Sequence, residues 1–512
     1  MSTKPPAASG GGDGVQRLKP NAVGLVGVIF MTLATAAPIT AMTSNMPIMA
    51  GIGTGTGAPA GFLIATAVLT IFSIGYIAMA RRITAAGAFY GFISHGLGRI
   101  VGMGSGLLAV LAYVVFEATL VALFAVFGKE TFEAQLGIDL PWQVYAFAMV
   151  ALIALLAFFE ISLTAKVLGA ILVLEILILA AVALAVLVSG GGPDGIPAAP
   201  INPVEAFDGP SVGIGLFFAF WCWVGFESTA MYGEESRDPK RTIPIATMVV
   251  VVGVGLFYAF VSWMVMSGNG VAETIALSKG SDPFETVFAP VREFLGGWAV
   301  TSFRWLLLTG SFACGMAFHN CAARYLYAFG REGFIHPSLG RTHPRHGSPY
   351  VASFVQSGLV VAITIAFWIS GMDPYAGQYS LMALLGTFSI LIVQALCSFA
   401  VVAYFWRQPG KRRPWTTLVA PLVGGVAMIG VVLLLVTNMD TAAGTASSTL
   451  FFTLIPWIVA AVFLLGCAIA LRLRQRSPER YRIIGHVTLA DEATAAAADP
   501  RPAAEPVRVG AA

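Results

Sequence analysis

The chain alternates long apolar stretches with short polar connections. The apolar stretches are close to, or longer than, the roughly 20 residues that a helix needs to cross the hydrocarbon core of a bilayer. Because the pattern recurs twelve times, we predict twelve membrane-spanning helices. The predicted segments are residues 23–46, 58–80, 100–127, 141–159, 164–189, 211–232, 243–267, 299–323, 349–371, 379–405, 415–437 and 448–472.

The first and sixth predicted segments contain residues near their middle that disfavour a helix. Residues 34–38 read ATAAP, and residues 220–227 read FWCWVGFE. A bilayer offers no water to freed backbone groups, so a broken helix at this depth must face protein or an aqueous cavity. Breaks at matching positions in two halves of a chain are typical of midplane binding sites in transporters. We therefore expect the two breaks to lie beside each other and to share one cavity.

Composition and charge support this topology. Hydrophobic residues make up 57% of the chain and charged residues 11%, whereas soluble domains carry about 25% charged residues. Of the 29 Lys and Arg residues, 25 fall in the N-terminus, in alternate loops or in the C-terminal tail. Only Lys129, Lys279 and Arg292 fall on the opposite side, and Arg304 lies inside a segment. Positively charged loops stay on the cytoplasmic side, so we expect cytoplasmic termini and no nucleic-acid binding.

Neither a metal site nor a nucleotide site is expected. All five cysteines fall in apolar segments and none has a partner at metal-ligand spacing, so the sequence predicts no disulfide and no zinc. The phosphate-binding pattern G-x-x-x-x-G-K-[ST] does not occur in the sequence. We therefore expect no cofactor, and we expect the energy for transport to come from an ion gradient or from exchange.

Three groups of residues form recognisable motifs. They are Gly225-Phe226-Glu227 followed by Glu234-Glu235, Pro239 and Pro244; the run 323–333 followed by His343-Pro344 and Ser348-Pro349; and Gly87-Ala88-Phe89-Tyr90. Together they resemble the sixth-helix break with its following loop, the loop after the eighth helix, and the turn before the third helix in the amino acid–polyamine–organocation (APC) superfamily of permeases. The resemblance extends from about residue 20 to about residue 475.

The resemblance implies a fold. It implies an all-α membrane protein of twelve transmembrane helices with a LeuT-like fold, in which two inverted repeats of five helices carry broken helices 1 and 6. The expected regions are a disordered cytoplasmic N-terminus at 1–20, the first inverted repeat at 21–189, the second at 211–405, helices 11 and 12 at 414–473, and a disordered cytoplasmic tail at 475–512.

The first break departs from the superfamily pattern. Members usually carry a Gly-rich stretch there, and its exposed backbone amides hold a substrate carboxylate. This chain has Thr35 to Thr40 instead, and Pro38 removes one N–H donor. The resemblance still implies an organic substrate that bears an amine.

The two breaks supply most of the expected substrate site. A broken helix exposes N–H groups at one half-helix end, which can hold a carboxylate, and C=O groups at the other, which can hold a cation. Glu227 either binds a substrate amine or accepts hydrogen bonds from freed backbone groups. The neighbouring aromatic residues either stack on the substrate or pack in the core. The predicted binding residues are Thr35, Ala36, Ala37, Ile39, Tyr113, Phe220, Trp221, Cys222, Trp223, Gly225, Phe226 and Glu227.

Four more ionisable residues lie inside predicted segments, where a charge is costly. Glu175 stands where proton-coupled members of the superfamily carry a lysine, and its carboxyl can bind a proton or sodium; alternatively, it stays protonated and bonds a neighbouring helix. Glu117 either pairs with Arg304, or it meets water while Arg304 extends outward. His319 either relays protons or is a packing residue. The predicted ion-coupling residues are Glu175, Glu117 and His319.

These features predict a secondary active transporter that moves an amino acid or related amine across the cytoplasmic membrane by alternating access, and we expect the uptake to be coupled to protons. The expected partners are this small molecule, a proton or sodium ion, and the lipid bilayer; the pattern does not fix an oligomeric state. One alternative is a membrane sensor or receptor of amino acids that does not transport them, which the short tails disfavour. Another is an exchanger of polyamines or organocations. An enzyme is not expected, because the sequence contains no nucleophile–base or metal constellation.

Overall fold

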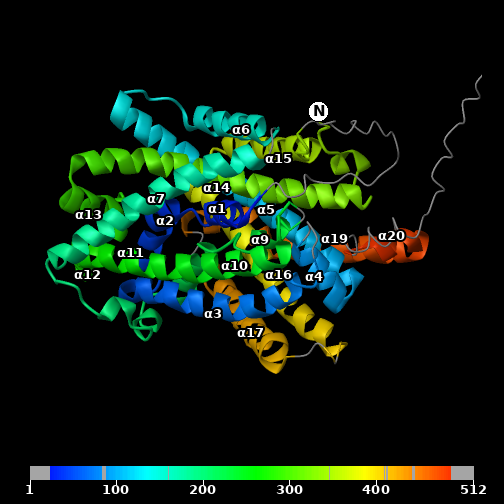
Figure 1. The fold of residues 1–512 in the computed structure, drawn as a ribbon. Helices are drawn as coiled ribbons and strands as arrows, with labels where there is room; N and C mark the ends of the chain where they lie inside the picture. The colour runs from blue at the N-terminus through cyan, green and yellow to red at the C-terminus, as the bar shows by residue number, and fades with distance from the viewer. Residues whose placement is uncertain are drawn as a thin grey trace, which may run out of the picture.

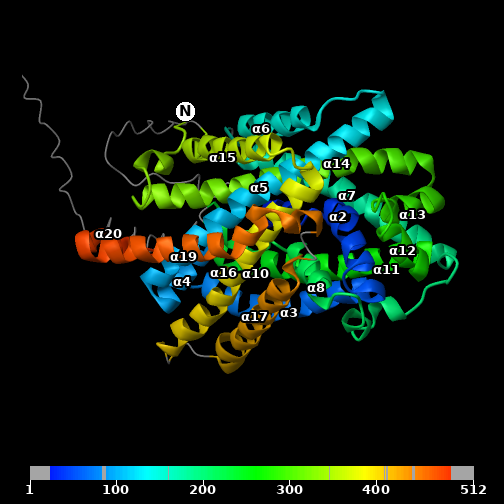
Figure 2. The same ribbon diagram turned by 180° about the vertical axis from the view of Figure 1, so that it is seen from behind.

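The protein is a bundle of helices that run roughly along one common axis (Figures 1 and 2). The computed structural model describes residues 23–83, 88–158, 161–233, 235–344, 346–408, 410, 413–440 and 444–485. The predicted N-terminal tail at 1–20 and the part of the predicted C-terminal tail after residue 485 lie outside the described residues. Most of residues 475–485 are helical, because α19 runs to Arg476 and α20 follows it.

The described part of the chain contains helices and no β-strand. The helices are α1 (Leu25–Ala36), α2 (Pro38–Gly51), α3 (Ala58–Ala80), α4 (Ala88–Leu97), α5 (Arg99–Leu136), α6 (Trp142–Phe158), α7 (Ile161–Ser189), α8 (Val212–Trp221), α9 (Ser228–Met231), α10 (Pro239–Met248), α11 (Val254–Asn269), α12 (Val271–Ser278), α13 (Glu285–Leu295), α14 (Gly297–Arg331), α15 (Tyr350–Ile369), α16 (Ser380–Trp406), α17 (Ala420–Thr437), α19 (Leu450–Arg476) and α20 (Pro478–Ile483).

Ten helical spans among the described residues are long and apolar enough to cross a membrane. Two shorter apolar helices, α6 and α8, coincide with two more of the predicted segments. This number of apolar spans confirms an all-α, multi-pass membrane protein.

Several helices extend beyond the apolar windows that predicted them. α5 continues past residue 127 to Leu136 although Lys129, Glu130 and Glu133 are polar, because a helix no longer needs apolar side chains where it leaves the bilayer. The short helices α4, α12 and α13 were not predicted, since none is long enough to cross a bilayer. Figure 1 places α12 and α13 at one end of the bundle and α4 and α20 at the other.

The arrangement separates central helices from peripheral ones. α1 lies in the middle of the bundle in Figure 1, and it packs against α7, α10 and α14. Most residues of α5 and α14 are buried. In contrast, α17 and α19 expose large apolar side chains such as Val426, Leu433, Trp457 and Leu464. Such faces suit contact with lipid acyl chains, whereas nearly all residues of α2 and α8, next to the two breaks, are buried.

The first predicted segment is broken at Ala37. α1 ends at Ala36 and α2 begins at Pro38, and Ala37 has a left-handed backbone with φ 41° and ψ 73°. Proline lacks an N–H and disfavours a helical residue before it. The Ala34 carbonyl therefore has no helical donor four residues later, and the chain turns at this point.

The sixth predicted segment is broken over residues 222–227. α8 ends at Trp221, α9 begins at Ser228, and a series of turns connects them. Gly225 within these turns has φ 103°, a conformation that glycine adopts readily and other residues rarely adopt. The position of this break therefore follows in part from Gly225.

The structure places the two breaks against each other. A Cβ atom added to Gly225 would lie 2.3 Å from Thr35 Oγ1 and 2.4 Å from Thr35 Cβ. Across the same junction, Ser228 Oγ donates to Thr32 Oγ1 at 3.5 Å. Only a residue without a side chain fits between the second break and α1.

The variant Gly225→Ala is expected to lower the free energy of unfolding by about 2–5 kcal/mol, because the added methyl group overlaps Thr35 and alanine disfavours a positive φ. Thermal unfolding of the purified protein in detergent measures this change. Gly358→Ala is the matched control, since Gly358 lies in α15 with no atom within 4 Å of an added Cβ. A Gly225→Ala variant as stable as the parent would contradict the close approach of the two breaks.

Candidate functional site

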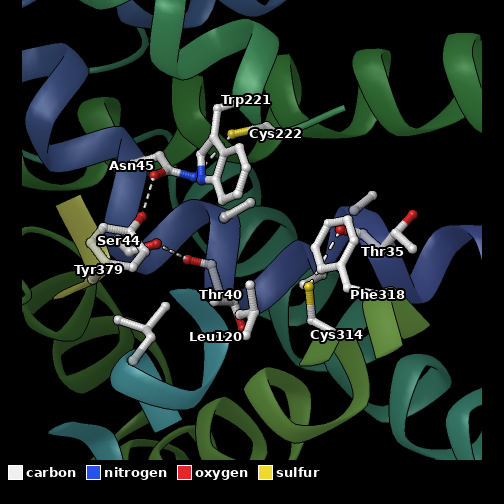
Figure 3. Close-up of a pocket in the computed structure, with 14 residues that line it drawn as sticks. Thr35, Thr40, Ser44, Asn45, Leu120, Trp221, Cys222, Cys314, Phe318 and Tyr379 are labelled. Atoms are coloured by element: carbon white, nitrogen blue, oxygen red, sulfur yellow. Dashed lines mark hydrogen bonds between the residues drawn. The ribbon is translucent and has the colours of Figure 1, made fainter. Parts of the chain in front are cut away.

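A small buried cavity lies where the two breaks meet α5, α14 and the turn before α16 (Figure 3). Its volume is about 20 Å³, which is enough for a water molecule but not for an amino acid. The cavity must therefore widen before it can hold an organic substrate. It is lined by Thr35, Ala36, Ala37, Thr40, Ala41, Ser44, Asn45, Leu120, Leu123, Trp221, Cys222, Cys314, Phe318 and Tyr379.

Polar side chains of α2 form one wall of this cavity. Asn45 Nδ2 donates to Cys222 Sγ at 3.2 Å, and Tyr379 Oη donates to Asn45 Oδ1 at 2.9 Å. These contacts join α2, the second break and the start of α16 (Figure 3). Thr40 Oγ1 is buried without a hydrogen-bond partner among the described residues, which leaves it available to a ligand.

Five of the predicted binding residues line the cavity, and seven do not. Those that line it are Thr35, Ala36, Ala37, Trp221 and Cys222. Those that do not are Ile39, Tyr113, Phe220, Trp223, Gly225, Phe226 and Glu227.

The aromatic residues of the second break point in different directions. Trp221 faces the cavity, where its ring lies 4.8 Å from the centroid of Phe116 and stacks on Phe318 at 6.5 Å. Trp223 instead packs on Tyr258 and donates to a backbone carbonyl in the α10–α11 span. Phe226 packs edge-on against Phe72 of α3. Trp221 is thus the aromatic residue of this break that a ligand in the cavity would meet.

Glu227 is fully buried and bonds the freed backbone of its own break. Its carboxylate oxygens accept hydrogen bonds from Gly225 N–H at 3.1 Å and from Tyr113 Oη at 2.7 Å. Its backbone carbonyl accepts a bond from Tyr76 Oη at 2.6 Å. In this conformation Glu227 stabilises the break, as the second of the two interpretations describes.

Glu175 does the same for the first break. This carboxyl, buried in α7, accepts a hydrogen bond from Ile39 N–H at 3.3 Å. Its other oxygen lies against Gly310 of α14, where an added Cβ would be 2.7 Å away. A carboxyl from α7 therefore occupies the N-terminal end of α2, next to residues that line the cavity.

Glu117 and His319 lie in contact, which the sequence did not predict. His319 Nδ1 is 3.0 and 3.1 Å from the two Glu117 carboxylate oxygens, and His319 Nε2 is 2.6 Å from Ser353 Oγ. Gln356 Nε2 donates to Glu117 at 2.7 Å. These four side chains are buried and form a cluster that joins α5, α14 and α15; we call it the Glu117 cluster.

The suggested pairing of Glu117 with Arg304 is wrong. The Arg304 guanidinium lies over the ring of Phe288 in α13, 4.6 Å from its centroid. α13 lies at the end of the bundle (Figure 1), whereas Glu117 finds its partners deeper in α14 and α15. The half-buried arginine side chain therefore packs on an aromatic ring and not on Glu117.

Sequence reasoning missed the residues that complete the cavity. Thr40, Ser44 and Asn45 had a signal, because they are polar residues within an apolar segment at spacings of four and five. Tyr379 had none, since it stands at the start of a predicted segment. Within the part of the chain that the structure describes, no three His, Cys, Asp or Glu residues are grouped as metal ligands.

The motif residues tie the helices together at the end of the bundle away from α13. Arg324 donates to the two carboxylate oxygens of Glu235 at 2.9 and 3.1 Å, and both side chains are buried. Tyr90 Oη donates to Glu332 at 2.6 Å. Of the other motif residues, Gly87 and Glu234 lie outside the described residues.

Comparison with known proteins adds to this geometry. The amino acid permease family model matches residues 23–489. The chain is 21% identical over 410 residues to the branched-chain amino acid permease BcaP of Bacillus subtilis, covering 75% of this chain and 81% of the relative. It is 24% identical over 408 residues to BcaP of Lactococcus lactis, covering 73% and 80%. It is also 23% identical over 394 residues to the low-affinity putrescine importer PlaP of Escherichia coli, covering 76% and 82%.

The family match covers most of the chain, and it includes both helix breaks and every residue that lines the cavity. The relatives are permeases and importers, which carry molecules rather than transform them. The protein therefore belongs to the amino acid permease family of the APC superfamily and is a membrane transporter, not an enzyme.

Proposed function

We propose that the protein moves an amino acid or related amine across the cytoplasmic membrane by secondary active transport. The observation that carries this proposal is the buried cavity between two broken helices in a chain of the permease family. The relatives are named for branched-chain amino acids and for putrescine, and both kinds of molecule bear an amine. The cavity opens to each side of the membrane in turn, and backbone groups at the two breaks contact the substrate.

The proposed architecture is a LeuT-like fold of twelve transmembrane helices. Residues 21–189 form the first inverted repeat, 211–405 the second, and 414–473 the last two helices. The ten long apolar spans, the two shorter apolar helices and the breaks in the first and sixth segments support this division. Both termini are cytoplasmic in this proposal, which the bias of Lys and Arg supports.

We assign Glu175 as the residue that couples transport to the proton gradient. Its buried carboxyl bonds Ile39 N–H at the N-terminal end of α2, so a change in its protonation alters a contact that holds the first break. Glu117 and His319 are the next candidates, because they are in contact and buried. Sodium is the alternative ion, since a carboxylate can also bind this cation.

A non-transporting sensor of amino acids is the second candidate from a different class. The two functions differ in one measurement, which is uptake of labelled substrate by proteoliposomes that contain the purified protein. Uptake above protein-free liposomes supports the transporter. Binding without uptake or exchange supports the sensor.

Glu227→Gln is expected to weaken the binding of a substrate with a positively charged amine by about tenfold or more, because it removes one of the two buried carboxylates at the breaks. Thermal stabilisation by ligand, read across a concentration series, measures the affinity. Glu273→Gln is the matched control, because Glu273 is exposed on α12. Unchanged affinity in Glu227→Gln would mean that Glu227 only stabilises its own break.

Glu175→Gln is expected to keep substrate exchange and to lose accumulation driven by a proton gradient. The glutamine oxygen can still accept the hydrogen bond of Ile39 N–H, but the side chain can no longer take up and release a proton. The measurement is uptake under an imposed proton gradient beside counterflow without one. If the variant accumulates substrate as the parent does, coupling lies elsewhere, with Glu117 and then His319 as the next residues to test.

A further inference from the structure

The first break offers few donors to a substrate carboxylate. A half-helix N-terminus usually binds an anion through its first free N–H groups. In α2, Pro38 has no N–H, and Ile39 N–H already donates to Glu175. Of these first three residues, only Thr40 has an N–H group without an acceptor in the part of the chain that the structure describes.

The second break does not supply free backbone N–H donors for a substrate carboxylate either. The N–H groups of Cys222, Trp223 and Val224 donate to carbonyls of the preceding turn. Gly225 N–H donates to the Glu227 carboxylate, and Phe226 N–H donates to the Trp223 carbonyl. Every backbone donor from 222 to 226 is therefore engaged before a ligand arrives.

The acceptors, in contrast, favour a cation. The Ala34 carbonyl at the C-terminal end of α1 has no helical donor because residue 38 is proline, and this end of a helix carries partial negative charge. The next two carbonyls, of Thr35 and Ala36, already accept from Cys314 Sγ and Tyr258 Oη. Thr40 lines the cavity and is 5% exposed, and its Oγ1 is buried with no partner among the described residues. Trp221 adds an aromatic face on which an ammonium group can rest.

The charged side chains around the cavity also favour a cationic substrate. The described residues that line the cavity include no Lys, Arg or His, so none of them offers a positive charge to a carboxylate. The carboxyls of Glu175 and Glu227 each accept a hydrogen bond from the backbone of a break. A substrate carboxylate at Ile39 would have to displace Glu175 and then lie beside it.

We propose that the substrate is an organic ammonium ion that carries no carboxylate: an alkylamine or diamine, and not an α-amino acid. This inference rests on the proposed transport function and narrows it to one substrate class. The ammonium group lies at Thr40 Oγ1 beside the C-terminal end of α1, and the alkyl chain lies against Trp221 and Phe318.

The test compares each amino acid with the amine left when its carboxyl group is removed. Suitable pairs are leucine and 3-methylbutylamine, ornithine and putrescine, lysine and cadaverine, and phenylalanine and phenethylamine. The full-length protein is assayed by ligand-induced thermal stabilisation and by counterflow in proteoliposomes. We expect at least one amine to bind about tenfold or more tightly than its amino acid.

The outcomes separate this inference from the function on which it rests. Amino acids that bind or exchange as well as their amines would overturn the inference and leave the transporter intact. A protein that neither binds nor exchanges any member of either series would overturn the proposed function, and the inference with it.

A variant tests the mechanism of the selectivity. Glu175→Ala frees Ile39 N–H and removes the repelling carboxyl, so the preference for amine over amino acid should fall at least severalfold. Glu273→Ala, on the exposed face of α12, should leave the preference unchanged. Because the preference is a ratio measured on one sample, partial loss of folded protein does not alter it. An undiminished preference in Glu175→Ala would overturn the role of Glu175.

Discussion

Two buried carboxyl groups hold the backbone where the central helices are broken. Glu175 reaches from α7 to Ile39 N–H at the first break, and Glu227 turns back to Gly225 N–H at the second. Without water at this depth, an unpaired N–H would cost several kcal/mol. The breaks can exist in the middle of the bundle because these side chains supply the acceptors that the helices no longer provide.

The same arrangement gives the cavity its polarity. The carboxyl groups engage N–H donors, whereas the Thr40 hydroxyl lines the space between the breaks with no hydrogen-bond partner among the described residues. Trp221 and Phe318 stack on each other where they line this space. The volume of this space, about 20 Å³, is too small for an organic substrate in this structure.

Behind the aromatic residues lies the Glu117 cluster. Glu117 directly follows Phe116 in α5, and His319 directly follows Phe318 in α14. Neighbouring residues of a helix point in different directions, so the two phenylalanines meet on one side of these helices and the Glu117–His319 pair on another. Hydrogen bonds within the cluster fix α5, α14 and α15 relative to one another. Phe116 and Phe318, which meet Trp221, are therefore carried by helices joined through buried polar contacts.

The sequence by itself determined the class of the protein, the apolar segments and the positions of the breaks, because these depend on local properties: run length, proline at 38 and glycine at 225. It also identified the buried ionisable residues, since a charge is conspicuous in an apolar segment. Only the tertiary structure decided their partners. Glu117 meets His319 and not Arg304, and Asn45 and Tyr379 join the cavity, because such contacts depend on how helices far apart in the chain rotate and pack.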